Sequence, residues 1–468
     1  MTPTQEAAVN RLDNGTATQQ WHAEAAFIDD MVSPDVLIET RAGRITRVVP
    51  ESDAMPNAIR LPGLTLPGLA NAHSHAFHRA LRGRTQVGEG TFWTWREQMY
   101  EAVAGLDPES YRELATGVFA EMALAGITAV GEFHYVHHGA GGARYADPNA
   151  MGHALIEAAR AAGIRITLLD ACYLTGGIGA VLNSTQIRFS DGDADAWASR
   201  FAELQSTYSD DHDVTIGAAV HSVRAVPKEQ MGTVVSAAER FDAPIHMHLS
   251  EQRAENDSCL LRYRLTPAQL LESCGGLGLR STAVHATHLS QADIELLGDT
   301  QTCVCMCPTT ERDLADGVGV ARTLFEAGCP ISLGSDSHAV IDLFEEARAV
   351  ELDERLRTER RGHWSAADLI DTATVAGYDC LGWSDGGRLR AGGLADFTTV
   401  GLDSIRLTGT DPRYAAESVV YAATSADVRH VVVAGRQVVR DGVHMLVDEP
   451  ARRLGAAIKG VYQGSKGV

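Results

Sequence analysis

Apolar stretches of strand length alternate with helix-like stretches over most of this 468-residue chain. An alternation of this kind implies parallel βαβ units, in which each strand is followed by a helix that packs on the sheet. Eight strands are predicted, and eight parallel strands favour a closed (β/α)8 barrel of the TIM type. The predicted strands span residues 64–73, 128–135, 165–172, 214–221, 244–249, 282–286, 302–307 and 330–335.

Glycines mark the ends of several predicted helices. Gly126, Gly163 and Gly328 follow helical stretches, and glycine is the residue preferred just past a helix C-terminus because it adopts positive φ without strain. These helices are predicted over residues 108–125, 151–162 and 321–327, with a further one over residues 228–241.

Short strands are also predicted near both ends of the chain. Residues 20–28 and 35–50 have strand composition interrupted by turns, and so do residues 394–400 and 428–439. We therefore expect the two termini to build one small β-sandwich domain. The predicted organisation is 1–63 for the N-terminal part of this domain, 64–385 for the barrel, and 386–468 for the C-terminal part with a tail.

Polar side chains gather where the predicted barrel strands end. In a (β/α)8 barrel the carboxyl ends of the strands open into the loops that form the active site. A purely structural chain would place Gly, Asn or Ser at these positions. The residues found there are His73, His75, Tyr135, His221, Arg224, His248, Glu251, His285 and Asp336, so one pocket is the economical interpretation.

Four of these residues predict a metal site. His73 and His75 alternate on one strand and therefore share a face, although a lone His-x-His is weak evidence. With His248 and Asp336 they offer nitrogen and oxygen ligands suited to one zinc ion per subunit, and another divalent metal such as iron is an alternative. His246 shares a face with His248 but starts further down the barrel, so only His248 is assigned.

Two further residues predict catalysis beside the metal. Glu251, three residues after His248, can carry a proton from water to a leaving nitrogen. His285 can hydrogen-bond the attacking water or stabilise developing charge, and His288 is the weaker candidate. Cys303, Cys305 and Cys307 are predicted to be buried packing residues on an apolar strand.

Charge and cysteine usage restrict the partners. The formal net charge of −21 argues against nucleic acid and anionic membrane, since both require a basic face. The eight cysteines are scattered and the first residues lack the pattern of a secretory leader, so a reduced, cytoplasmic protein is expected. No apolar run approaches the roughly 20 residues that span a bilayer.

Several motifs resemble the amidohydrolase superfamily, and within it the formimidoylglutamate deiminases of histidine degradation. The resemblance runs from about Gly63 to Val439, and its most specific parts are the FWTWRE stretch at 92–97 and the FHYVHH stretch at 133–138. It also rests on Pro67-Gly68-Leu69, His73-Ser74-His75-Ala76-Phe77, His221-Ser222-Val223-Arg224-Ala225-Val226 and Val284-His285-Ala286-Thr287-His288.

The resemblance implies hydrolysis of N-formimidoyl-L-glutamate to N-formyl-L-glutamate and ammonia, by a homodimer. It implies that zinc binds the four residues named above, and that Glu251 and His285 act with Asp336. Substrate would contact His78, Arg96, Tyr135, His221 and Arg224. Independently, a substrate with two carboxylates requires guanidinium groups in an otherwise acidic protein. His78 departs from the family pattern, because some members have Gln there.

Two other functions fit part of the pattern. A zinc-dependent deaminase of a purine-like ring would use the same metal ligands, although two arginines and Tyr135 favour an acidic, acyclic substrate. A non-catalytic metabolite-binding barrel would be expected to lack a ligand, and none is missing. The glycine-rich stretch 173–195 is predicted to fold over the pocket as a lid.

Overall fold

The computed structural model describes residues 17–90 and 92–464 and contains an eight-stranded parallel sheet. Its strands are β5 (Leu69–Ser74), β6 (Ile127–His134), β7 (Arg165–Cys172), β8 (Val214–Ser222), β9 (Ile245–Leu249), β10 (Ser281–His285), β11 (Cys303–Met306) and β12 (Ile331–Leu333). Neighbouring strands follow the chain order from β5 to β12. A parallel bridge between Ser74 and Asp336 joins the first and last strands. The predicted (β/α)8 barrel is confirmed.

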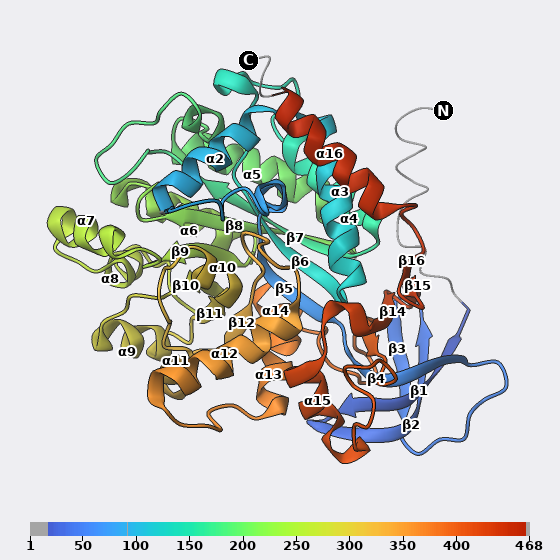
Figure 1. Ribbon diagram of the computed structural model, residues 1–468. Coiled ribbons are helices and arrows are strands. Elements are labelled where there is room, and N and C mark those ends of the chain that lie inside the picture. The colour runs from blue at the N-terminus through green and yellow to red at the C-terminus, as the bar shows by residue number, and fades with distance from the viewer. Residues whose placement is uncertain (1–16, 91, 465–468) are drawn as a thin grey trace.

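Helices surround this barrel, as Figure 1 shows. The helices are α2 (Phe92–Ala104), α3 (Pro108–Leu124), α4 (Ala150–Ala162), α5 (Ala194–Tyr208), α6 (Lys228–Arg240), α7 (Arg253–Tyr263), α8 (Pro267–Glu272), α9 (Gln291–Asp299), α10 (Pro308–Asp313), α11 (Ala321–Ala327), α12 (Leu343–Thr358), α13 (Ala366–Ala373), α14 (Val375–Cys380), α15 (Ala415–Ala422) and α16 (Pro450–Gly464). Gly163 and Gly328 cap α4 and α11 in the left-handed conformation, as predicted.

A second, mostly antiparallel sheet contains strands from both ends of the chain. Its strands are β1 (Gln19–Ile28), β2 (Met31–Arg41), β3 (Arg44–Val49), β4 (Ile59–Pro67), β13 (Phe397–Val400), β14 (Val428–Val433), β15 (Arg436–Arg440) and β16 (Val443–His444). β4 pairs with β13, which joins the N-terminal strands to the C-terminal ones, and blue and red strands lie together in Figure 1. The domain limits stay a prediction, and their outermost residues, 1–16 and 465–468, lie outside the described part.

The strand predicted over residues 64–73 is wrong in one respect, because the structure divides it at Gly68. β4 ends at Pro67 in the second sheet, and β5 begins at Leu69 in the barrel. A Cβ atom on Gly68 would lie 2.2 Å from Thr128 Oγ1, so the backbone passes too close to the neighbouring strand for any larger residue. An apolar run that is continuous in sequence therefore serves two sheets.

The connection between β7 and α5, residues 173–193, contains nearly all of the stretch predicted as a lid, residues 173–195. It contains a short 3-10 turn, Gln186–Phe189, and the side chain of Arg188 in this turn is buried. Arg188 donates to the carbonyls of His138 at 3.0 Å and Leu106 at 2.7 Å, and also to that of Val103. These bonds tie the connection to the segments after β6 and α2. No helix in the described ranges is long and apolar enough to cross a membrane.

Candidate metal and active site

The four predicted metal ligands converge at the carboxyl ends of the barrel strands. His73 Nε2 lies 3.2 Å from His248 Nε2 and 3.4 Å from Asp336 Oδ1. His75 Nε2 also lies 3.4 Å from Asp336 Oδ1. β5 supplies His73, the residue directly after β5 is His75, β9 supplies His248, and the loop after β12 supplies Asp336. All four side chains are buried.

The geometry and protonation of this cluster fit a divalent cation. A tetrahedral ion with bonds of about 2.0–2.1 Å separates its ligand atoms by roughly 3.3 Å, which is close to the observed spacings. His75 Nδ1 donates to the Phe133 carbonyl and His248 Nδ1 to the His221 carbonyl, each at 2.9 Å, so both Nε2 lone pairs face the cluster. Burial lowers the pKa of all three histidines, which keeps them neutral as ligands.

The predicted catalytic groups lie beside the cluster. His285 Nε2 is 3.7 Å from Asp336 Oδ2 and 4.0 Å from Glu251 Oε1. Burial alone would lower the pKa of His285, but a hydrogen bond to Glu311 and the charges of Glu251 and Asp336 raise it to about 10. Burial raises the pKa of Asp336 to about 7, against the opposing charge of His285. The arrangement can therefore hold and move protons next to an ion that the cluster would bind.

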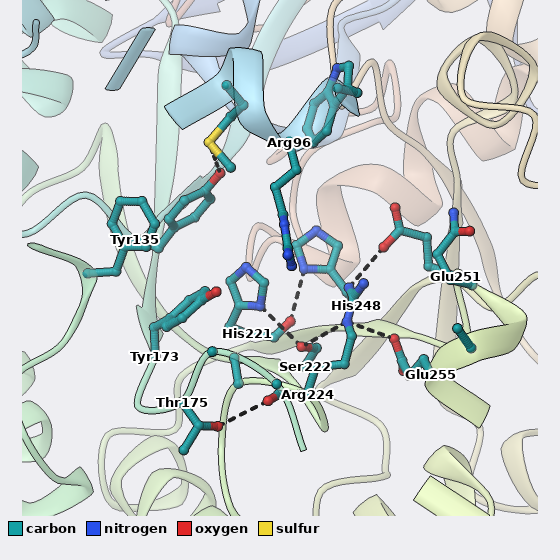
Figure 2. Close-up of a pocket in the computed structure, with 18 of the residues that line it drawn as sticks. Arg96, Tyr135, Tyr173, Thr175, His221, Ser222, Arg224, His248, Glu251 and Glu255 are labelled. Atoms are coloured by element: carbon teal, nitrogen blue, oxygen red, sulfur yellow. Dashed lines mark hydrogen bonds and ion pairs between the residues drawn. The ribbon is translucent and has the colours of Figure 1, made fainter. Parts of the chain in front are cut away.

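A cavity of about 360 Å³ opens over these groups. It is lined by the five predicted substrate-binding residues, three of the four predicted metal ligands (His75, His248 and Asp336) and the catalytic candidates. Arg96 reaches down from α2 above the metal ligands, while Tyr135, Tyr173 and His221 form an aromatic wall on one side (Figure 2). A volume of this size suits a small organic molecule.

Arg224 is bound to two carboxylates on the opposite side of the cavity. Its Nη2 donates to Glu251 Oε2 at 2.9 Å, and its Nε lies 3.0 Å from Glu255 Oε2 (Figure 2). A guanidinium predicted to bind substrate is thus also the partner of the predicted general acid. Glu255, in the first turn of α7 and four residues after Glu251, was missed from the sequence because nothing in a lone helical glutamate distinguishes it from a solvated charge.

His78 lies at the cavity wall between the metal ligands and α2. Its Nε2 is 3.2 Å from the Tyr135 hydroxyl, and its ring centroid is 4.5 Å from that of His75 and 5.0 Å from that of Trp95. Its Nδ1 is buried and has no hydrogen-bond partner in the described part of the chain. The substitution relative to some family members therefore faces the cavity.

His246 and the three cysteines of β11 and its end, which were not assigned to the site from the sequence, make other contacts. His246 Nε2 donates to the carbonyl of Cys380 at 2.9 Å, below the cluster. Cys303, Cys305 and Cys307 are buried in an apolar cluster, with Cys307 within ligand distance of His285 and Asp336. Their predicted packing role accords with this burial.

Comparisons with known proteins agree with this geometry. Residues 64–438 match the model of the amidohydrolase family. The chain is 36% identical over 443 residues to formimidoylglutamate deiminase of Pseudomonas aeruginosa, covering 92% of this chain and 96% of that protein. It is 33% identical over 386 residues to 8-oxoguanine deaminase of the same organism, covering 81% and 83%. A crystal structure of an amidohydrolase from Brucella melitensis superposes with a TM-score of 0.88 at 30% identity, covering 95% of this chain and 99% of that one.

Proposed function

The chain belongs to the amidohydrolase family, and we propose that it is a zinc-dependent deiminase that hydrolyses N-formimidoyl-L-glutamate to N-formyl-L-glutamate and ammonia. The observation that carries the proposal is one cavity in which a three-histidine, one-aspartate cluster, a proton-carrying glutamate and two arginines meet. The similarity to a formimidoylglutamate deiminase over nearly the whole of both chains supports the choice of substrate.

His73, His75, His248 and Asp336 Oδ1 would hold the ion. Bound there, zinc lowers the pKa of water so that hydroxide is available near neutral pH, and it polarises the carbon–nitrogen double bond. The second oxygen of Asp336 faces His285 rather than the histidine ligands, and it is free to accept a proton from the attacking water. One carboxylate thus serves both the ion and the proton.

Glu251 delivers a proton to the leaving nitrogen. Its Oε2 is occupied by Arg224, so Oε1, which faces His285, is the oxygen that carries the proton. Water oxygen adds to the formimidoyl carbon as one water proton passes by way of the carboxylates to the terminal nitrogen. The second water proton then leaves the new hydroxyl and reaches the same nitrogen by way of Asp336 and Glu251, the carbon–nitrogen bond breaks, and ammonia departs as the formyl carbonyl forms. His285 Nε2 donates a hydrogen bond to the water or to the oxygen on which charge develops.

The two carboxylates of the substrate meet the two arginines. Arg96 and Arg224 lie on different walls of the cavity, and Tyr135, His221 and His78 complete the polar surface between them. Guanidinium groups bind carboxylates through charge-assisted hydrogen bonds, which an uncharged purine could not use. Arg224 would make such a bond while it also holds Glu251 and Glu255. The enzyme would act in histidine degradation as a cytoplasmic homodimer, with no nucleic-acid or membrane partner.

A second candidate is the deamination of a purine-like ring. The 33% identity to 8-oxoguanine deaminase favours it, because the metal cluster suits both reactions. The aromatic wall of Tyr135 and Tyr173 could also stack on a flat base. The charge of the cavity is the discriminating feature, since a neutral base gains little from two guanidinium groups.

Ammonia release by purified, zinc-loaded protein tests the proposal. The substrates are N-formimidoyl-L-glutamate, N-formimidoyl-L-aspartate, guanine and adenosine, with metal content measured on the same sample. We expect a stoichiometric divalent ion, selective release from the glutamate compound, and loss of activity on chelation that zinc restores. Turnover of a purine with no release from the glutamate compound would contradict the proposed substrate and support the second candidate.

A further inference from the structure

The segment after β11 supports the site from behind, although the sequence assigned it no functional residue. It comprises Cys307–Asp316 and includes α10. Thr310 Oγ1 accepts from the backbone of Ser337, next to Asp336, at 3.1 Å. Asp316 accepts a hydrogen bond from Gln252, next to Glu251. Between these two contacts, Glu311 faces His285.

Glu311 binds the side of the His285 ring that points away from the reacting groups. Its Oε1 lies 3.4 Å from His285 Nδ1 and also accepts from the Cys307 backbone amide at 3.0 Å. The opposite ring nitrogen, Nε2, faces Asp336 and Glu251. A carboxylate can only accept from the ring unless it is itself protonated, so this contact places a proton on Nδ1 and fixes which nitrogen points into the site.

The backbone at His285 is strained, which makes the support necessary. His285 and Ala286 both have positive φ, +69° and +49°, although neither is glycine. Such conformations cost on the order of 1 kcal/mol each and persist only where the surroundings enforce them. The amide of Ala286 donates to the Leu249 carbonyl at 3.0 Å, which holds the main chain, but it does not set the rotation of the imidazole.

Glu311 does not line the cavity, so it cannot touch a substrate there. It is buried, with 4% of its surface exposed, and its carboxylate is enclosed between α10 and β10. Any effect on the reaction must therefore pass through His285. This separates Glu311 from Glu251 and Glu255, which line the cavity themselves.

We propose that Glu311 is a positioning residue that holds His285 through Nδ1, so that Nε2 faces the space between Asp336 and Glu251. The proposal rests on the proposed function, because it assigns Glu311 to the orientation of a residue in that reaction. It predicts that removing the Glu311 carboxylate leaves substrate binding in place and slows the chemical step, since the imidazole can then rotate and no longer holds Nε2 toward the space between Asp336 and Glu251.

A neighbouring glutamate provides a matched control. Glu346 of α12 is also fully buried and accepts from the backbone and hydroxyl of Thr309, at 2.9 and 2.5 Å. It therefore supports the same short helix through Thr309, two residues before Glu311, and within residues 17–90 and 92–464 it makes no hydrogen bond or ion pair with His285. A purely structural role for Glu311 predicts that Glu311 and Glu346 variants behave alike.

Steady-state kinetics on Glu311→Ala, Glu311→Gln and Glu346→Gln test the proposal. Glu311→Ala should lower kcat by roughly 10- to 100-fold, the usual effect of losing a supporting contact behind a site residue, with KM and metal content unchanged. Glu311→Gln should recover most of kcat, because its amide oxygen still accepts from Nδ1 and from Cys307. Glu346→Gln should retain wild-type kcat and KM within about twofold.

Three outcomes would overturn the proposal: parallel losses in the Glu311→Ala and Glu346→Gln variants, a rise in KM at constant kcat, or a Glu311→Gln variant as slow as Glu311→Ala. If the alanine variant does not fold, the protonation of His285 in the wild-type protein decides. Histidine-labelled 15N NMR of the zinc-loaded protein, assigned with His285→Asn, gives a readout without substrate. A proton fixed on Nδ1 is expected, and a proton on Nε2 alone would refute the contact whatever substrate the enzyme turns over.

Discussion

Asp336 divides its two oxygens between separate tasks. Oδ1 lies 3.4 Å from the Nε2 atoms of His73 and His75, whereas Oδ2 points to His285. Glu251 is divided in the same way, with Oε2 on Arg224 and Oε1 toward His285. Each of these two carboxylates therefore has one oxygen that can exchange a proton. Both oxygens, Asp336 Oδ2 and Glu251 Oε1, face the imidazole of His285.

The two glutamates on Arg224 allow proton transfer to be separated from ion pairing. Glu251→Gln should lower kcat by roughly 10²- to 10⁴-fold with metal content intact, because an amide cannot deliver a proton to the leaving nitrogen. Glu255→Gln removes the other carboxylate from Arg224 but leaves Glu251 facing His285, and it should chiefly alter KM. Steady-state ammonia release measures both variants. Near-normal turnover by Glu251→Gln, or equal kcat losses in the two variants, would contradict the assigned role.

Glu132 of β6 links stability to pH from a buried position beside Ser74, the residue between His73 and His75. It accepts from Ser74 Oγ at 2.6 Å and from the Ala76 amide at 2.7 Å, and burial raises its pKa to about 8 from an ordinary 4.5. Between pH 4.5 and about pH 8, Glu132 is ionised in the unfolded chain but keeps its proton in the folded protein. The free energy of unfolding should therefore fall as pH rises, by at most about 1.4 kcal/mol per pH unit.

Glu132→Gln should lose that contribution, because its amide does not titrate. Urea unfolding of metal-free protein at several pH values from 5 to 8 measures the difference between the two proteins. We expect the unfolding free energy of the variant to decline less steeply than that of the wild type over this range. Parallel declines would show that Glu132 is ionised in the folded protein throughout.

At the scale of elements, strand ends were the most predictable part of the site. Polar residues that interrupt apolar strands at their carboxyl ends have to meet in a barrel, and His73, His248 and Asp336 do so although they are far apart in sequence. Helix ends were predictable for a local reason, since Gly163 and Gly328 adopt the left-handed conformation that stops a helix.

Contacts that depend on how one element is oriented against another could not be predicted. Glu311 reaches His285 across 26 residues only because the short helix α10 turns it toward β10. Arg188 stabilises the connection before α5 through backbone carbonyls, which carry no sequence signal. The division of residues 64–73 between two sheets also depends on tertiary structure, because Pro67-Gly68 could equally have bent a single strand.

At the scale of the whole molecule, a buried ion pair joins the barrel to the second sheet. Arg165 begins β7, and its guanidinium contacts Asp396 just before β13, with a nitrogen–oxygen distance of 2.7 Å. Asp396 also accepts from the Tyr378 hydroxyl at 2.8 Å and the Ala434 amide at 2.7 Å, so one carboxylate connects β7, α14 and the turn after β14. This junction lies at the amino end of β7, opposite the end that forms the site.

Asp396→Asn should destabilise the protein without changing its chemistry. Losing one partner of a buried ion pair costs about 3–5 kcal/mol, because the remaining guanidinium stays buried with less compensation. Asp213→Asn is the matched control. Asp213 accepts a hydrogen bond from the same arginine at 2.9 Å, but this bond lies within the barrel and does not join it to the second sheet. Urea unfolding should give the larger loss for Asp396→Asn, while kcat and KM at 25 °C stay at wild-type values in both. Equal losses of unfolding free energy in the two variants would mean that Asp396 stabilises Arg165 alone and contributes nothing to the junction. A loss of activity in Asp396→Asn alone would mean that the second sheet helps to shape the site from the far end of the barrel.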